Sequence, residues 1–199
     1  MKEKIKISFE LRREAFHIFL GIIVMLLIFL FKENAMWLLF FALIIGITLS
    51  LLSLKFKLPI IHYMLLHFVR PKYLHKFPGK GMLFFVAGCL LILKLFSANL
   101  NIVLASIAIL ILGDSISHLV GLKAKKKIAK RNIGGTISGI IAAFIGASFF
   151  VKPLFAFIAA LVAMLSENIS LRVGLQEVDD NVIIPLVAGT TIFLLLKIF

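Results

Sequence analysis

The chain has 199 residues, a formal net charge of +13 and 62% hydrophobic residues. Its mean hydropathy of +1.13 is too high for an ordinary soluble domain. The single cysteine, Cys89, lies in an apolar segment, which excludes a disulfide framework and a cysteine-rich metal site. The positive charges lie in loops between apolar segments. This placement favours contact with anionic lipid or nucleotide phosphates over binding of nucleic acid.

The hydropathy pattern predicts an all-α fold, a polytopic membrane helix bundle with about seven transmembrane helices. We expect residues 1–199 to form a single integral-membrane domain. The predicted spans are Ala15–Phe31, Ala35–Leu54, Gly81–Phe96, Leu100–Leu122, Ile133–Val151, Pro153–Ile169 and Val182–Phe199. The third of them is close to the lower length limit for a spanning helix, about 17 residues.

The distribution of basic residues predicts the orientation of the chain in the membrane. Lysines and arginines gather before the first span, between the second and third, and between the fourth and fifth, whereas the alternate loops carry few. The positive-inside rule therefore places the N-terminus in the cytoplasm and the C-terminus outside. We expect a multi-pass protein of the cell membrane, or of the endoplasmic reticulum membrane in a eukaryotic cell.

The longest stretch between predicted spans is Lys55–Lys80. Its apolar centre, Ile60–Val69, fits either a helix lying flat at the membrane interface or a solvated loop. The proline after Arg70 ends such a helix. Lys80 stands between two glycines, where the backbone can approach a ligand closely and the ammonium group can meet a phosphate.

Polar residues in the first predicted helix follow helical spacing. Glu10, Glu14, His17 and Gly21 are separated by four, three and four positions, which places them on one face. That face runs from the cytosolic interface into the membrane. A histidine there either bonds a neighbouring helix or takes part in a site, and we expect the stripe to point at Asp114.

The fourth predicted helix carries a second polar face near its cytoplasmic end. Asp114 shares this face with Ser117 or His118 and with Gly121. An aspartate in a membrane helix can be structural, but acidic groups in hydrocarbon are costly and call for a functional explanation. The basic loop that follows favours a metal or phosphate role for Asp114.

The fifth predicted helix opens on Lys130, Arg131 and Asn132, followed by Gly134 and Gly135. Amides at a helix N-terminus can cradle an anion, and the neighbouring cations add to this attraction. The alternative is that the cations orient the span while the glycines serve helix packing. Small residues do continue along one face, at Gly135, Gly139, Ala142 or Ala143, and Gly146.

Carboxylates also mark the ends of the last two predicted helices. Glu167 closes a small-residue face formed by Ala156, Ala160 and Ala163. Asp179 and Asp180 precede the last helix, where such a pair serves either as an N-cap or as hard oxygen ligands for magnesium. The predicted orientation brings these carboxylates and Asp114 to the cytosolic face.

Taken in order, these motifs resemble those of the dolichol kinase and phytol kinase family over nearly the whole chain. They are Glu10-Leu11-Arg12-Arg13 with His17 and Gly21, Pro78-Gly79-Lys80-Gly81, Gly113-Asp114-Ser115 with Gly121, Gly135-Thr136, Glu167, and Asp179-Asp180-Asn181 with Pro185. The resemblance implies a lipid kinase-like domain and CTP-dependent phosphorylation of a lipid alcohol. It also implies kinship with the phosphatidate cytidylyltransferases. One position departs from the family, whose Lys-Ser-x-Glu-Gly-Thr segment has a glutamate where this chain has Gly134.

The chemistry of phosphoryl transfer assigns roles to these residues. Magnesium neutralises charge on the nucleotide phosphates, and a positioned group accepts the hydroxyl proton. We predict magnesium ligands at Asp114, Glu167, Asp179 and Asp180, and catalytic roles for Asp114, Glu14 and His17. The predicted nucleotide contacts are Lys80, Lys130, Arg131, Asn132, Gly134 and Gly135.

The substrates predicted for the chain are a nucleotide and a membrane lipid alcohol of the dolichol, polyprenol, phytol or diacylglycerol class, with no nucleic acid partner. Two alternatives remain at this point. One is a CTP:lipid-phosphate cytidylyltransferase that makes a CDP-lipid, and the other is a transporter without enzymatic activity. A transporter needs polar groups at mid-membrane, whereas the polar residues here stop at one face.

Overall fold

The computed structural model describes residues 2–56, 58–70, 74, 77–122, 127–128, 131–169, 172–173 and 176–199, and their side chains except those of 2–6, 127–128, 131, 173 and 176. The described chain is mainly helical. Its helical elements are α1 (Lys2–Phe31), η1 (Lys32–Asn34), α2 (Ala35–Lys55), α3 (Pro59–Phe68), α4 (Lys80–Phe96), α5 (Leu100–Ala108), η3 (Ile109–Asp114), α6 (Ser115–Gly121), α7 (Ile133–Ala147), α8 (Pro153–Ser166) and α9 (Asp180–Ile198).

Two short antiparallel strand pairs add to the helical fold. β1 (Lys127–Ile128) pairs with β2 (Arg131–Asn132), and β3 (Arg172–Val173) pairs with β4 (Gln176–Glu177). Each strand has two residues, and each pair lies in the connection between two helices. The predicted helical class is confirmed, and these hairpins are additions that a hydropathy pattern does not predict.

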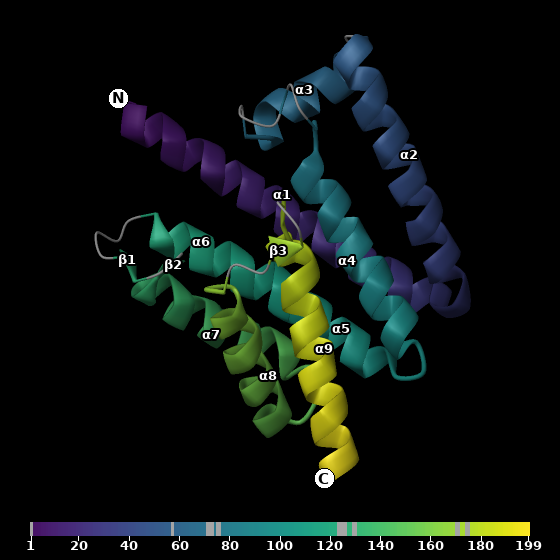
Figure 1. The fold of residues 1–199 in the computed structure, drawn as a ribbon, viewed down its shortest axis with the longest axis vertical. Helices are drawn as coiled ribbons and strands as arrows, with labels where there is room; N and C mark the ends of the chain where they lie inside the picture. The colour runs from purple at the N-terminus through teal and green to yellow at the C-terminus, as the bar shows by residue number, and fades with distance from the viewer. Residues whose placement is uncertain are drawn as a thin grey trace.

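The helices run between two ends of the molecule (Figure 1). The first, which we call the site end, holds the start of α4, the end of α6 and the starts of α7 and α9. The second, the far end, holds η1, the turn between α4 and α5, and the C-terminus. The two chain termini therefore lie on opposite sides of the molecule.

A continuous helical stretch, Leu100–Gly121, forms the centre of the fold. In an apolar segment of 18 residues within this stretch, 72% of the residues are buried. The corresponding buried share is 22% in Ile7–Lys55 and 33% in Asp180–Ile198. The stretch matches the predicted fourth span, but its middle, η3, is a π-helical turn. Such turns widen the helix and recur at functional sites. Here the π-turn ends at Asp114.

Close packing of small residues joins α7 to the central stretch. A methyl group added at Gly135 would lie 2.6 Å from the main-chain oxygen of Ser117, and one added at Gly139 would lie 2.8 Å from that of Gly113. The predicted packing role of this stripe is confirmed. Helix α8 packs against both α7 and η3 and buries the alanines Ala156, Ala159, Ala160 and Ala163 completely.

Most predicted helix boundaries agree with the structure, but α1 begins at Lys2, well before the predicted span Ala15–Phe31, and two later helices are shorter than predicted. The helices α7 and α8 have 15 and 14 residues, fewer than the predicted spans Ile133–Val151 and Pro153–Ile169. A turn over 148–151 and Pro153 at the first position of α8 separate them. Of the two alternatives for Ile60–Val69, a helix or a loop, the structure shows a helix, because α3 covers Pro59–Phe68.

Three helices of the described chain are long and apolar enough to cross a membrane: Ile7–Lys55, which includes η1, Leu100–Gly121 and Asp180–Ile198. Two shorter apolar helices, α7 and α8, accompany them. The outer face of α2 exposes large apolar side chains, including Trp37, Phe40, Phe41, Ile44 and Ile45. Such a surface is not expected to face water.

Candidate functional site

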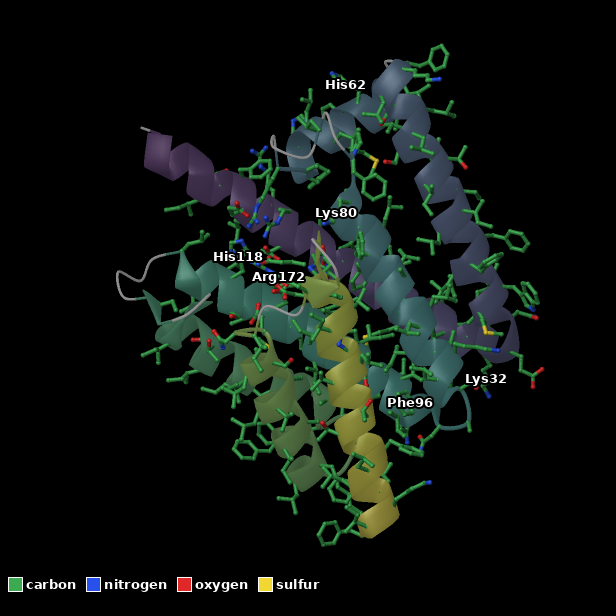
Figure 2. All side chains as sticks on the ribbon, in the orientation of Figure 1. Lys32, His62, Lys80, Phe96, His118 and Arg172 are labelled. Carbon is green, nitrogen blue, oxygen red and sulfur yellow. The ribbon has the colours of Figure 1, made fainter. Side chains whose placement is uncertain are left out.

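A cavity of about 750 Å³ lies at the site end and is walled by segments from across the whole sequence. Its walls come from α1, the end of α3, the start of α4, η3 with α6, β2, and the segment that enters α9. Seven residues predicted to form a site line this cavity together: Glu14, His17, Lys80, Asp114, Asn132, Asp179 and Asp180. Figure 2 shows Lys80, His118 and Arg172 in this region, away from Lys32 and Phe96 at the far end.

The polar stripe of α1 faces the protein interior, as its spacing predicted. Glu10 and Glu14 are buried, and Glu14 is only 1% exposed. His17 packs edge-on against Phe85 of α4, with ring centroids 4.8 Å apart. Gly21 lies against Ile111 so closely that an added methyl group would be 2.2 Å from its side chain. Gly21 therefore makes room for the neighbouring helix.

The predicted approach of this stripe to Asp114 is confirmed. Nδ1 of His17 lies 3.9 Å from Oδ2 of Asp114 and 3.8 Å from Oε2 of Glu14. One ligand atom from each of these three residues can be chosen so that all lie within 4.8 Å of one another. A divalent cation fits such a group, because carboxylate oxygens and an imidazole nitrogen are common metal ligands.

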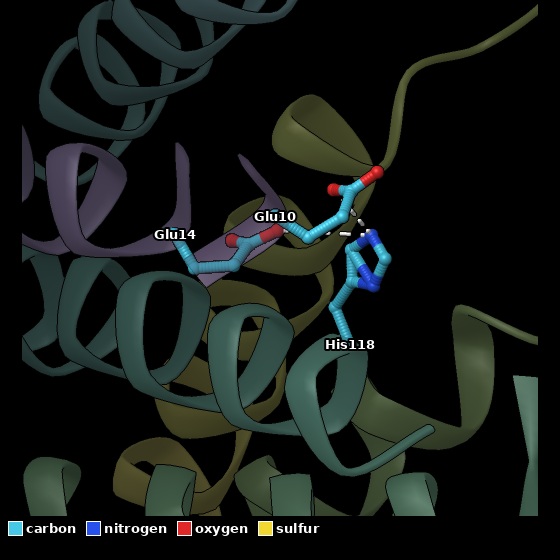
Figure 3. A group of neighbouring side chains, drawn as sticks. All are labelled: Glu10, Glu14 and His118. Carbon is cyan, nitrogen blue, oxygen red and sulfur yellow. Dashed lines mark ion pairs between the residues drawn. The ribbon is translucent and has the colours of Figure 1, made fainter. Parts of the chain in front are cut away.

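A second polar group shares Glu14 and lies next to the first. Figure 3 shows Glu10 and Glu14 on α1 beside His118 on α6. Nε2 of His118 lies 3.3 Å from Oε2 of Glu10 and 3.8 Å from Oε1 of Glu14. Two guanidinium groups also enter this cluster. Arg13 forms ion pairs with Glu10, at 2.7 Å, and with Glu14.

Arg70, which follows α3, is the second of these guanidinium groups. Its Nε and Nη2 atoms donate to the two oxygens of Glu10, at 3.2 Å and 3.4 Å. Nη2 also contacts Nε2 of His118. Sequence reasoning missed Arg70 as a site residue, because Glu10 lies 60 positions away. It also left Ser117 and His118 as alternatives, and both line the cavity.

The start of α9 forms another part of the cavity wall. Asp179 is the N-cap of α9, and its Oδ1 accepts from the main-chain nitrogen of Asn181 at 3.2 Å and from its side chain at 2.8 Å. Asn181 also donates to the main-chain oxygen of Gly81 on α4, at 3.4 Å. Asp179 thus combines the structural capping role with a place on the cavity wall.

Lys80 is the first residue of α4, and its position depends on the preceding residue, Gly79. Gly79 has φ +73°, in the left-handed region that favours glycine. Nζ of Lys80 lies 5.2 Å from the centroid of the Phe84 ring. Lys80 is one of the residues that line the cavity.

The start of α7 contributes less to the cavity than the sequence predicted. Asn132 lines it, but its Oδ1 accepts from the amide of Gly134 at 2.9 Å and so caps α7. Gly134 and Gly135 are not among the lining residues. Gly135 serves the packing contact with α6. Lys130 and the side chain of Arg131 lie outside the part that the structure describes.

Glu167 stands behind the cavity wall. It is fully buried at the end of α8, and Oγ of Ser117 donates to its Oε2 at 3.5 Å. Ser117 itself lines the cavity. The two three-residue groups that could hold a metal within the described chain contain neither Glu167 nor Asp179 and Asp180. Of the four predicted magnesium ligands, only Asp114 belongs to such a group.

Comparison with known proteins identifies a relative along nearly the whole chain. An uncharacterized protein of Methanocaldococcus jannaschii is 28% identical over 180 residues, which cover 90% of this chain and 91% of that protein. No protein-family model and no solved structure matches the chain. The printed name of this relative carries no activity.

Proposed function

We propose that the chain is a polytopic membrane protein of about seven spans, with its N-terminus in the cytoplasm and its C-terminus outside. Three observations support this. Three helices are long and apolar enough to cross a membrane. The outer face of α2 is covered with large apolar side chains. The two termini lie on opposite sides of the fold (Figure 1). In this orientation the site end, with its cavity, faces the cytosol.

We further propose that the cavity is the active site of a phosphotransferase that phosphorylates a membrane lipid alcohol, with CTP as the donor. The observation that carries this proposal is the composition of the cavity wall. It combines a compact carboxylate and histidine group, the cations of Arg13, Arg70 and Lys80, and an apolar side. Phosphoryl transfer to a lipid at an interface needs all three.

The apolar side of the cavity is suited to bind the hydrocarbon chain of the lipid. Phe16, Leu20 and Phe85 line it next to the polar groups of α1. A lipid alcohol carries its hydroxyl at the end of an apolar chain, so these side chains would bind the first part of that chain. Its hydroxyl would then lie beside Glu14, His17 and Asp114. That one of these three orients the hydroxyl or accepts its proton remains a prediction.

The cationic side provides for the nucleotide. The ammonium of Lys80 and the guanidinium of Arg70 are suited to bind phosphate oxygens through charge-assisted hydrogen bonds. Magnesium, when bound, would neutralise the developing phosphate charge. The residues present fit a divalent cation, since Asp114 belongs to a group of three potential ligands. The preference for CTP over other nucleotides comes from the family resemblance alone.

The test is incubation of purified protein with γ-labelled CTP, magnesium and a panel of lipid alcohols and lipid phosphates. Label transferred to a lipid alcohol supports the kinase. Labelled pyrophosphate released only with a lipid phosphate supports the cytidylyltransferase instead. Absence of either product with every lipid and with ATP as an alternative donor overturns the proposed phosphotransferase.

A further inference from the structure

The two potential metal groups share Glu14 but use its two oxygens differently. Oε1 of Glu14 faces Arg13 and His118, whereas Oε2 faces His17. One carboxylate therefore serves two neighbouring clusters. These clusters compete as candidates for a cation, and their charges and hydrogen bonds decide between them.

The cluster of Glu10 and His118 is already saturated by guanidinium groups. Glu10 accepts from Arg70 on both oxygens and is paired with Arg13 at 2.7 Å. Arg70 also contacts Nε2 of His118. A guanidinium has only donors, so Nε2 of His118 must be the acceptor in that contact, and its lone pair is used. Two fixed positive charges at this position oppose a third cation.

The cluster of Glu14, His17 and Asp114 includes one guanidinium contact, from Arg13 to Oε1 of Glu14, while Oε2 of Glu14 faces His17. Nδ1 of His17 faces both carboxylates at 3.8 Å and 3.9 Å, beyond normal hydrogen-bond length. Its Nε2 atom is buried without a hydrogen-bond partner in the described part of the chain. Ligands about 2.1 Å from a common ion lie roughly 3–4 Å from each other. The separations of Nδ1 from the two carboxylate oxygens fall within that range.

We propose that Oε2 of Glu14, Nδ1 of His17 and Oδ2 of Asp114 bind one divalent metal ion, and that the site prefers Mn²⁺ to Mg²⁺. The preference follows from the imidazole ligand, because nitrogen ligands suit transition metals and carboxylate oxygens alone suit Mg²⁺. The inference deepens the proposed function by naming its metal ligands. It assigns His17 to the metal instead of the substrate hydroxyl.

The experiment is electron paramagnetic resonance of Mn²⁺ added to the purified full-length protein in neutral detergent, without nucleotide or lipid. We expect one tightly bound Mn²⁺ per chain, with spin-echo modulation from a coupled nitrogen. Mg²⁺ should displace it only at a much higher concentration. Because no substrate is present, a negative result here is separate from a negative result in the kinase assay.

Matched variants identify the ligands. His17→Gln should abolish the nitrogen modulation, whereas His118→Ala, which removes the other imidazole of the cavity, should retain it. Asp114→Asn should weaken Mn²⁺ binding about tenfold or more, and Asp179→Asn should leave it unchanged. The thermal unfolding midpoint of each variant without metal shows whether it is folded. Nitrogen modulation that survives in His17→Gln, or its absence from the wild-type protein, overturns the proposed site.

Discussion

The guanidinium of Arg70 contacts Nε2 of His118, 48 positions further along the chain. The same group donates to both oxygens of Glu10 on α1. One side chain thus ties together α1, the end of α3 and α6 at the site end of the molecule. The contact also holds the α3 segment, which packs on α1 through the stacked rings of Phe16 and Phe68, against the cavity.

We predict that Arg70→Ala lowers the free energy of unfolding, because it removes the ion pair with Glu10. The expected loss is only about 1 kcal/mol, because the Arg70 side chain is 35% exposed and solvent weakens its ion pairs. Thermal unfolding in detergent measures the effect. Arg172→Ala provides the control, since the ion pair of Arg172 with Glu177 is largely exposed. An equal effect of the two substitutions would contradict the structural role of Arg70.

A glycine in α7 provides a second stability test. We predict that Gly135→Ala destabilises the protein by about 1–3 kcal/mol, because the new methyl group would lie 2.6 Å from the main-chain oxygen of Ser117. Gly81→Ala is the control, since nothing lies within 4 Å of a methyl group there. Unfolding midpoints that rank the two variants in the reverse order would contradict the close packing of α6 and α7.

The nucleotide contacts predict a selective change in Michaelis constants. Lys80→Ala should raise the KM for CTP about tenfold or more and change that for the lipid little, because a charge-assisted hydrogen bond contributes roughly 1.5–3 kcal/mol. Lys94→Ala, in the last turn of the same helix, is the control. We expect Arg131→Ala to act like Lys80→Ala. An unchanged KM for CTP would contradict the predicted nucleotide contacts. Lys80 and Arg131 would then serve only to orient the helices in the membrane.

Much of the helical fold follows from sequence, because hydropathy and helix-ending residues act locally. The predicted span Gly81–Phe96 differs from α4 by one residue. Helix α8 begins at Pro153 and Asp179 caps α9, and both residues are helix-start signals that can be recognised in the sequence. The π-turn η3 leaves no such signal, since its composition is as apolar as that of α5. Local patterns therefore could not predict the widened turn that ends at Asp114.

The site was predictable in part. Helical spacing correctly aligned Glu14 and His17 on one face, and topology brought them to the end that holds Asp114. The role of Arg70 depends on contacts over 60 and 48 positions, which no spacing rule gives. Glu167 was expected at the metal, but it lies behind Ser117, because the packing of α8 against α7 and η3 places it there, and such packing is a tertiary effect.

The proposed membrane orientation has a direct test. Reporter fusions at Phe199 should be active outside the cytoplasm, and fusions after Lys127 should be active in the cytoplasm, because basic loops stay on the cytoplasmic side. Fusions within the turn between α4 and α5 provide a further extracytoplasmic point. A cytoplasmic reporter at Phe199 would mean that an even number of helices crosses the membrane.

Whether this cavity is catalytic is decided by comparing the wild-type protein with Asp114→Asn in the transfer of label from γ-labelled CTP to a lipid alcohol. The substitution keeps the size of the side chain but removes the charge next to His17, 3.9 Å away. We predict labelled lipid phosphate from the wild-type protein and a loss of turnover in the variant, with its unfolding midpoint unchanged within a few degrees. Near-normal transfer by a folded Asp114→Asn variant would contradict the placement of catalysis in this cavity.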